Sequence, residues 1–255
     1  MCIDCGCGPT DHEHRHHHDR MHGHKHENGH EHDHETRTLR IEEDILAKNG
    51  RLAGCNRDSF VANGVFVLNL VSSPGSGKTS ILERTLTDLN DQLHFAVLEG
   101  DQQTSNDADR IAATGVPVRQ INTGAGCHLD AHMIGHGVEA FDLGGTDILL
   151  IENVGNLVCP AAFDLGEDHK VVVLSVTEGE DKPVKYPQMF QAADLLLINK
   201  IDLLPYLRFD IEQCKAYARQ VNPRIRILEI SCQSGEGLQA WYDWLAEGVD
   251  VKRAK

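Results

Sequence analysis

From residue 65 onward, the hydrophobic positions of the chain are gathered in seven short apolar runs that alternate with longer amphipathic stretches. Uniformly apolar runs of this kind are typical of strands buried on both faces, and residues at helical spacing lie between most of them. The expected strands span residues 66–71, 94–98, 118–121, 147–151, 170–176, 195–198 and 225–230, and the expected helices span 80–89, 129–141, 212–220 and 238–245. Strands that alternate with helices predict an α/β fold with a mostly parallel sheet and helices on both faces.

Apolar residues also recur at helical spacing over residues 39–62, ahead of the first strand. Ile45 and Phe60 belong to this pattern, while Gly50 and Gly54 weaken its middle because glycine is a poor helix former. The pattern predicts one long or broken helix that leads into the α/β domain.

The composition changes sharply near residue 37. Residues 11–35 contain 11 of the 16 histidines, interleaved with Asp, Glu and Gly, and almost no apolar side chains. Such a segment cannot bury enough surface to offset its chain entropy, so we expect it to be disordered and to bind metal by composition. The expected organisation is a Cys- and His-rich tail over 1–36, a helical segment over 37–64 and the α/β domain over 65–255.

Charge and hydropathy exclude several classes of protein. The net charge of −15 makes the chain a poor general binder of nucleic acid. No apolar run approaches the roughly 18 residues of a membrane span, and no apolar segment typical of a secretory signal opens the sequence. We therefore expect a cytoplasmic protein with no nucleic-acid or membrane partner.

The strongest motif is a glycine-rich loop between the first expected strand and the helix that follows. It reads Ser-Ser-Pro-Gly-Ser-Gly-Lys-Thr over residues 72–79, with Ser72 in place of the usual first glycine. In such a P-loop the backbone N–H groups and the helix N-terminus surround phosphates, the lysine reaches the β/γ-phosphates and the threonine holds Mg²⁺. The expected nucleotide contacts are Gly75, Ser76, Gly77, Lys78, Thr79 and Ser80.

A second motif, Asn199-Lys200-Ile-Asp202, follows the expected strand at 195–198. A carboxylate such as Asp202 can accept two hydrogen bonds from guanine N1–H and N2–H₂, a donor pair that adenine lacks. Ser231 and Cys232 begin a loop after the last strand that is similar to the remaining guanine-contacting loop of GTPases. These residues predict GTP and GDP as the nucleotides.

Two acidic strand ends complete the expected catalytic site. Asp101 closes the second strand and Glu152 closes the fourth, in a Glu-x-x-Gly form that replaces the Asp-x-x-Gly of many GTPases. Carboxylates at the C-terminal edge of a parallel sheet face the ligand crevice, so both are candidates for Mg²⁺ contact, directly or through water. Ordinary polar strand ends are the alternative. The expected catalytic set is Lys78, Thr79, Asp101 and Glu152, with Thr79 and Asp101 as metal contacts.

Two groups of residues predict transition-metal sites. Cys2, Cys5 and Cys7 offer three thiolates within six residues, and the N-terminal amine can be a fourth donor, a set that suits Ni²⁺ as well as Zn²⁺. The second group lies in loops of the domain. Cys127, His128 and Cys159 are expected at the nucleotide edge of the sheet, one ligand short of a closed zinc site, so that a second subunit or water must complete it. His132 and His136, four residues apart, are expected to be partly exposed helix residues rather than ligands.

Together these motifs resemble the nickel-incorporation GTPases of hydrogenase maturation, the HypB family. The matching segments are Cys2-x-x-Cys5-Gly-Cys7, the histidine-rich tail and residues 45–49, 72–79, 99–104, 123–130, 151–160 and 199–202. They cover nearly the whole chain, and the family also has a serine at the position of Ser72.

The resemblance implies a GTPase of the SIMIBI class that forms a homodimer when GTP is bound. It implies nickel handed to the large subunit of a [NiFe]-hydrogenase, with the small zinc protein HypA as a partner. Cys127, His128 and Cys159 match the family's G-domain metal site at the dimer interface. Cys2, Cys5 and Cys7 match the tighter N-terminal site of some members.

Three other functions remain open at this point. A urease-maturation GTPase also has a histidine-rich tail but typically a Cys-Pro-His motif, whereas Cys127 here is followed directly by His128. A nickel store with a vestigial nucleotide site is opposed by the intact P-loop and the Asn-Lys-x-Asp motif. The same motif and the lack of an evident lid oppose a small-molecule kinase.

Overall fold

The structure is a computed structural model that describes residues 30–101, 106–124 and 126–254. Cys2, Cys5, Cys7 and the histidines before residue 30 lie outside the described residues. The chain divides after Ile45 into two units, and the fold described below is that of the unit from Leu46 onward.

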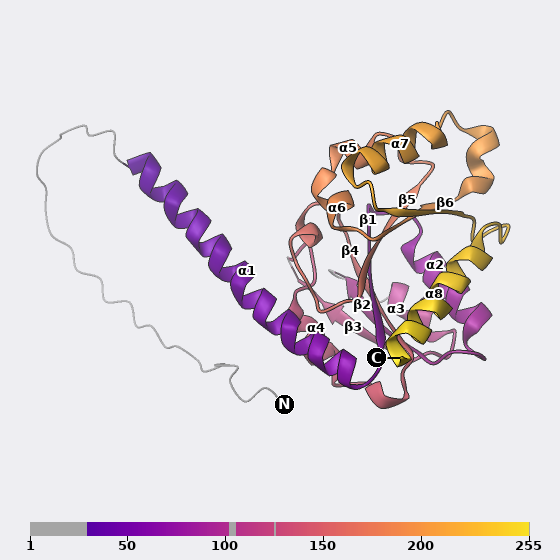
Figure 1. Cartoon of the computed structure of the whole chain (residues 1–255), viewed down its shortest axis with the longest axis horizontal. Helices are drawn as coiled ribbons and strands as arrows, with labels where there is room; N and C mark the ends of the chain where they lie inside the picture. The colour runs from indigo at the N-terminus through magenta and orange to yellow at the C-terminus, as the bar shows by residue number, and fades with distance from the viewer. Residues whose placement is uncertain (1–29, 102–105, 125, 255) are drawn as a thin grey trace, which may run out of the picture. The chain divides into compact units, whose positions relative to one another are not determined.

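A seven-stranded sheet forms the centre of the domain (Figure 1). The strands lie in the order β3-β2-β4-β1-β5-β6-β7, and every neighbouring pair is parallel. The strands are β1 Phe66–Ser72, β2 Phe95–Asp101, β3 Val118–Asn122, β4 Ile148–Gly155, β5 His169–Ser175, β6 Leu195–Asn199 and β7 Arg226–Ile230. The expected α/β fold with a parallel sheet is confirmed.

Helices connect the strands, as parallel pairing requires. The α-helices are α1 His30–Ala62, α2 Lys78–Leu89, α3 Asn106–Ala112, α4 Ala131–Val138, α5 Lys182–Lys185, α6 Pro187–Ala192, α7 Ile211–Val221 and α8 Leu238–Arg253, and the short 3₁₀ helices are η1 Leu143–Gly145, η2 Cys159–Ala161 and η3 Ile201–Tyr206. Helix α1 begins nine residues before the expected start at residue 39. The expected start was based on apolar periodicity, which cannot detect a helix made of polar residues. Residues such as His, Glu and Arg are compatible with a helix although they add no apolar pattern. The expected tail therefore includes helical residues at 30–36.

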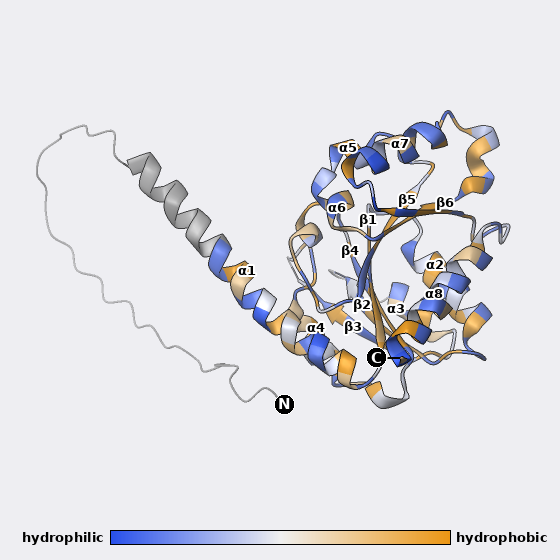
Figure 2. Ribbon diagram, viewed as in Figure 1, coloured by the Kyte–Doolittle hydropathy of each residue, from blue (hydrophilic) through white to orange (hydrophobic). Residues whose placement is uncertain are grey.

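Strand β1 shows how one mostly apolar run, interrupted by the buried Asn69, contributes to both faces of the sheet. Leu68 and Leu70 belong to a core that also contains α2 and α8 residues. The alternate residues face away: Val67 joins a core with α1 and α4 residues, and Val71 joins one with α6 and α7 residues. Side chains of a strand alternate between faces, so burial of both sides favours apolar residues at most positions, and the buried Asn69 is satisfied by donating to Glu167 over 3.0 Å. The hydropathy view shows the strands of the sheet as largely orange ribbons with some blue stretches, between helices of mixed colours (Figure 2).

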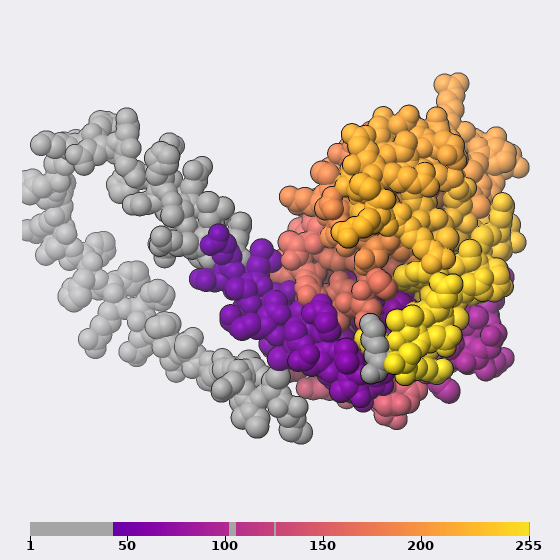
Figure 3. All heavy atoms as spheres, in the orientation of Figure 1, coloured from indigo at the N-terminus to yellow at the C-terminus, as the bar shows by residue number. Residues whose placement is uncertain are grey.

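Helix α8 covers one face of the sheet and closes the domain. Trp241 and Leu245 are fully buried, whereas Val251 near the helix end is exposed. In the space-filling view the last turns of α8, in yellow, lie open on the surface (Figure 3). A helix that could cross a membrane is absent from residues 30–101, 106–124 and 126–254, because none combines the necessary length and apolar content.

Candidate nucleotide and metal site

The P-loop connects β1 to α2 and depends on two glycines in the left-handed region. Gly75 has φ +78° and Gly77 has φ +98°, so the loop turns sharply before α2 begins at Lys78. A Cβ atom on Gly77 would lie 2.6 Å from the side-chain nitrogen of Asn199. That nitrogen donates to the carbonyl of Ser76 over 3.0 Å. The close approach ties the loop to the end of β6, where the base-reading motif begins.

Lys78 is folded into the loop. Its Nζ donates to the hydroxyl of Ser72 over 2.8 Å, and the residue is only 8% exposed. Burial lowers the pKa of Lys78, and the charge of Glu152 opposes this effect. Ser72, at the position of the usual first glycine, therefore supplies an acceptor that orients the lysine.

The carboxylate of Glu152 lies against the first turn of α2. The Thr79 hydroxyl donates to its Oε1 over 2.8 Å, whereas its Oε2 has no hydrogen-bond partner among the described residues. Burial raises the pKa of Glu152, and the charge of Lys78 opposes the increase. A cavity of about 530 Å³ is lined by the P-loop together with Asp101, Asp107, Arg110 and Glu152.

This cavity has donors that suit Mg²⁺. The hydroxyl of Thr79 and the carboxylates of Asp101 and Glu152 are the oxygen ligands that Mg²⁺ prefers. The unpartnered buried oxygen of Glu152 is the observation that supports the fit, because a buried carboxylate oxygen without a partner is costly. The residues expected from the sequence are thus compatible with the ion.

Glu99 belongs to the same acidic group, and sequence reasoning did not select it. It pairs with Glu152 in the register of β2 and β4 and is 3% exposed. Burial and the nearby charges of Glu152 and Asp101 raise the pKa of Glu99 to about 8. The available signal was its spacing of two residues from Asp101, which places both side chains on one face of β2.

The second cavity, of about 820 Å³, adjoins the P-loop and contains the base-reading residues Asn199, Lys200, Asp202 and Cys232. Lys200 has φ +64°, and its ammonium donates to the carbonyl of Gly75 over 2.8 Å. The hydroxyl of Ser231 donates to Asp202 over 2.5 Å, which fixes one carboxylate oxygen. Both loops named from the sequence therefore meet in one cavity beside the phosphate cavity, and Gly77, Ser80 and Lys200 line both.

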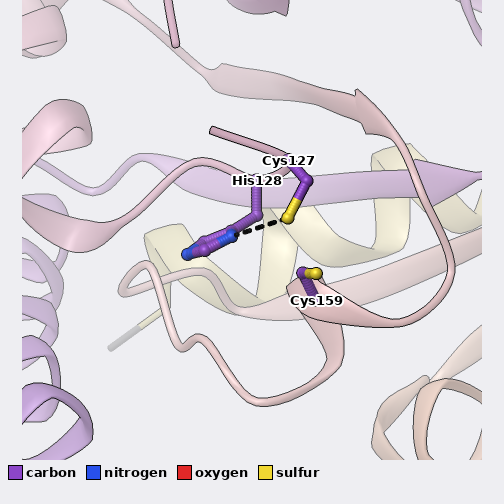
Figure 4. Close-up of side chains that lie close together, drawn as sticks. All are labelled: Cys127, His128 and Cys159. Atoms are coloured by element: carbon purple, nitrogen blue, oxygen red, sulfur yellow. Dashed lines mark hydrogen bonds between the residues drawn. The ribbon is translucent and has the colours of Figure 1, made fainter. Parts of the chain in front are cut away.

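Cys127, His128 and Cys159 also come together, as the sequence predicted. Their ligand atoms all lie within 4.8 Å of one another, and the Cys127 sulfur is 3.6 Å from Nδ1 of His128 (Figure 4). The ring of His128 lies 3.9 Å from that of Phe163, centroid to centroid. Burial lowers the pKa of His128, which favours the neutral imidazole that can bind a metal.

The cluster is held by buried polar side chains that sequence reasoning missed. Asn153, next to Glu152, accepts from the backbone N–H of Leu129 over 3.1 Å. Lys170 of β5 is buried, and its ammonium donates to the carbonyl of Pro160, next to Cys159, over 2.9 Å. A lysine inside an apolar run was the only signal available for this second anchor.

His132 and His136 lie on α4 with their Nε2 atoms 3.2 Å apart. Both residues are exposed, in agreement with the expectation that they are surface residues of a helix.

Comparison with known proteins agrees with this geometry. The family model described as CobW/HypB/UreG, nucleotide-binding domain, matches residues 66–229. The hydrogenase maturation factor HypB of Azotobacter vinelandii is 64% identical over 210 residues, which are 82% of this chain and 69% of that protein. The crystal structure of the hydrogenase maturation factor HypB from Archaeoglobus fulgidus matches with a TM-score of 0.75 and 42% identity, covering 80% of this chain and 99% of that one. HypB from Helicobacter pylori, solved in complex with nickel, matches with a TM-score of 0.75 and 41% identity over 80% of this chain and 95% of that one.

Proposed function

Since this chain belongs to the HypB family and is a GTPase, we propose that it carries nickel and delivers it to the large subunit of a [NiFe]-hydrogenase during maturation. GTP hydrolysis would drive or time the delivery. Nickel is here the cargo of the protein rather than a resident cofactor.

The observation that carries the proposal is that β4 and the loop after it serve both sites. Glu152 lines the phosphate cavity near the end of β4, and Cys159 lies seven residues later in the metal cluster. A change in the position of the β4 end with the nucleotide would move a metal ligand directly. Nucleotide-sensitive loops of this kind are the usual switching elements of GTPases.

The hydrolytic step would use groups of the phosphate cavity. Lys78 supplies positive charge at the β/γ-phosphates, and the N-terminus of α2 adds backbone donors. Thr79, Asp101 and Glu152 would hold Mg²⁺, which would supply positive charge against the negative charge of the phosphates. Asp202, fixed by Ser231, would select guanine.

The metal cluster would hold nickel in an exchangeable way. Two thiolates and one imidazole leave the coordination of the ion incomplete, so another subunit can supply the remaining ligands. Val158, beside Cys159, is 57% exposed, which favours a contact surface at this point. We propose a GTP-dependent homodimer with this cluster at its interface; Zn²⁺ would fit the same donors.

Further parts of the proposal rest on the sequence. Cys2, Cys5 and Cys7 would form a second, tighter nickel site, and the zinc protein HypA would be the partner in transfer. These residues lie outside the described part of the chain, so the motif and the family resemblance are their support.

Hydrogenase activity in a strain that lacks the gene tests the proposal. The wild-type gene should restore activity at low nickel, and Cys127→Ala should restore it only when excess nickel is supplied. Urease activity in the same strains is the control for a urease-type function. A Cys127→Ala protein that restores hydrogenase fully at low nickel would contradict nickel delivery through this cluster.

A further inference from the structure

The side chain of Asn156 connects the two loops that carry the metal cluster. Its Nδ2 donates to the carbonyl oxygen of Cys127 over 3.2 Å. Its Oδ1 accepts from the backbone N–H of Val158 over 2.8 Å. One amide thus holds the backbone directly before His128 and directly before Cys159.

Cys127 and Cys159 are both ligands of the proposed metal site, so these two hydrogen bonds fix the backbone of both ligand loops. Hydrogen bonds outside the ligand set of this kind orient the ligands and thereby influence metal affinity.

Asn156 is also one residue away from the phosphate cavity. Gly155 lines that cavity, and a Cβ atom on it would lie 3.1 Å from Cγ of Pro74 in the P-loop. The backbone that packs on the P-loop therefore continues directly into the residue that holds Cys127.

We propose that Asn156 is a positioning residue of the metal site, which fixes Cys127 and Cys159 relative to each other. The inference rests on the proposed function, because it takes the cluster to bind nickel. A residue that only closes the local turn at 156–158 would need its Oδ1 acceptor alone. A residue that positions Cys127 needs its Nδ2 donor.

The test uses the full chain with Cys2→Ser, Cys5→Ser and Cys7→Ser as the parent protein, titrated with Ni²⁺ at buffered free concentrations. The readouts are the nickel affinity and the position of the thiolate-to-nickel charge-transfer band, to which histidines do not contribute. Cys127→Ser combined with Cys159→Ser in this parent should remove the band. A parent without any such band would reject the proposed function, and this inference with it.

Asn156→Ala should weaken nickel binding by about tenfold and shift the band. Asn156→Asp keeps the acceptor for Val158 but loses the donor, so it should bind nickel no better than the alanine variant. Asn63→Ala, which loses an exposed side-chain hydrogen bond to Ser59, is the matched control and should match the parent. Thermal unfolding of each variant checks that it is folded. If the alanine variant is unstable, the aspartate variant alone serves as the test. A normal band and affinity in Asn156→Asp, with the parent band present, would overturn the inference while leaving the proposed function intact.

Discussion

The hydroxyl of Thr79 donates a 2.8 Å hydrogen bond to Glu152, and this bond joins the first turn of α2 to the C-terminal half of β4, which continues to Gly155. The two residues are 73 positions apart in the sequence. The parallel sheet brings them together because β1 and β4 are neighbours, so the start of α2, which follows β1, lies beside the C-terminal half of β4. The relationship places a carboxylate beside the threonine that holds Mg²⁺ in P-loop proteins.

Glu152→Gln tests this placement. Glutamine keeps an oxygen that can accept from Thr79 but loses the charge, so GTP hydrolysis should fall by about 100-fold and require more Mg²⁺. Single-turnover hydrolysis over a range of Mg²⁺ concentrations measures both effects. Glu139→Gln, at an exposed position directly after α4, is the control. Wild-type turnover of Glu152→Gln at every Mg²⁺ concentration would show that this carboxylate has no part in the reaction.

Gly77→Ala should abolish nucleotide binding. The new Cβ would lie 2.6 Å from Asn199, and φ +98° is strained for any residue with a side chain. Gly115→Ala separates the two effects, because Gly115 has φ +82° but nothing within 4 Å of its Cβ position. That control should lose about 1 kcal/mol of stability and keep its affinity for GTP. Titration with a fluorescent guanine nucleotide makes the comparison, and equal affinities would refute the tight loop geometry.

Asp202→Asn should change nucleotide choice. The carboxylate, held by Ser231, becomes an amide, so the affinity for GTP should fall by about tenfold while that for xanthosine triphosphate rises. Hydrolysis of bound xanthosine triphosphate should continue, because the phosphate cavity is unchanged. An undiminished GTP affinity in competition titrations would mean that Asp202 does not read the base.

Stability should fall with rising pH because of Glu99. Its pKa is raised from 4.5 to about 8 by burial and by Glu152, so the folded state binds a proton that the unfolded state releases. The contribution of this bound proton to the free energy of unfolding is present in full below about pH 4.5 and is lost as the pH rises through about 8. Glu99→Gln should therefore be more stable than the parent at pH 8, by more than about 1 kcal/mol, and the difference should shrink toward pH 5. Denaturant unfolding in metal-free buffer gives the free energy of unfolding as a function of pH. Glu236→Gln, which removes one exposed carboxylate, is the control. A pH-independent difference between Glu99→Gln and the parent would contradict the buried acidic pair.

The sheet could be predicted from sequence because its strands are mostly apolar on both faces, as in β5 from Val171 to Leu174. The short helices α3, α5 and α6 were not predicted, because helices of four to seven residues carry too little periodicity. The sequence also placed helix α1 too late, since its first turns contain no apolar pattern.

The residues of the candidate site that lie in recognisable sequence motifs could be predicted from the sequence. Lys78 and Asp202 lie in such motifs, and Cys127 could be joined to Cys159 because both loops leave the same sheet edge. Glu99 and Asn156 could not be selected in this way. Their roles depend on register between strands and on hydrogen bonds between loops, which only the folded chain reveals.

The central claim is that the nucleotide state and the metal cluster are coupled through β4. Its most direct test is the Ni²⁺ affinity of the full chain carrying Cys2→Ser, Cys5→Ser and Cys7→Ser, measured by thiolate-to-nickel absorption at buffered free nickel. The account predicts that affinities in the GTP-analogue and GDP states differ by about fivefold or more, and that nickel shifts nucleotide affinity by the same factor. Equal nickel affinity in the two states would contradict the account and leave GTP hydrolysis coupled to partner docking instead.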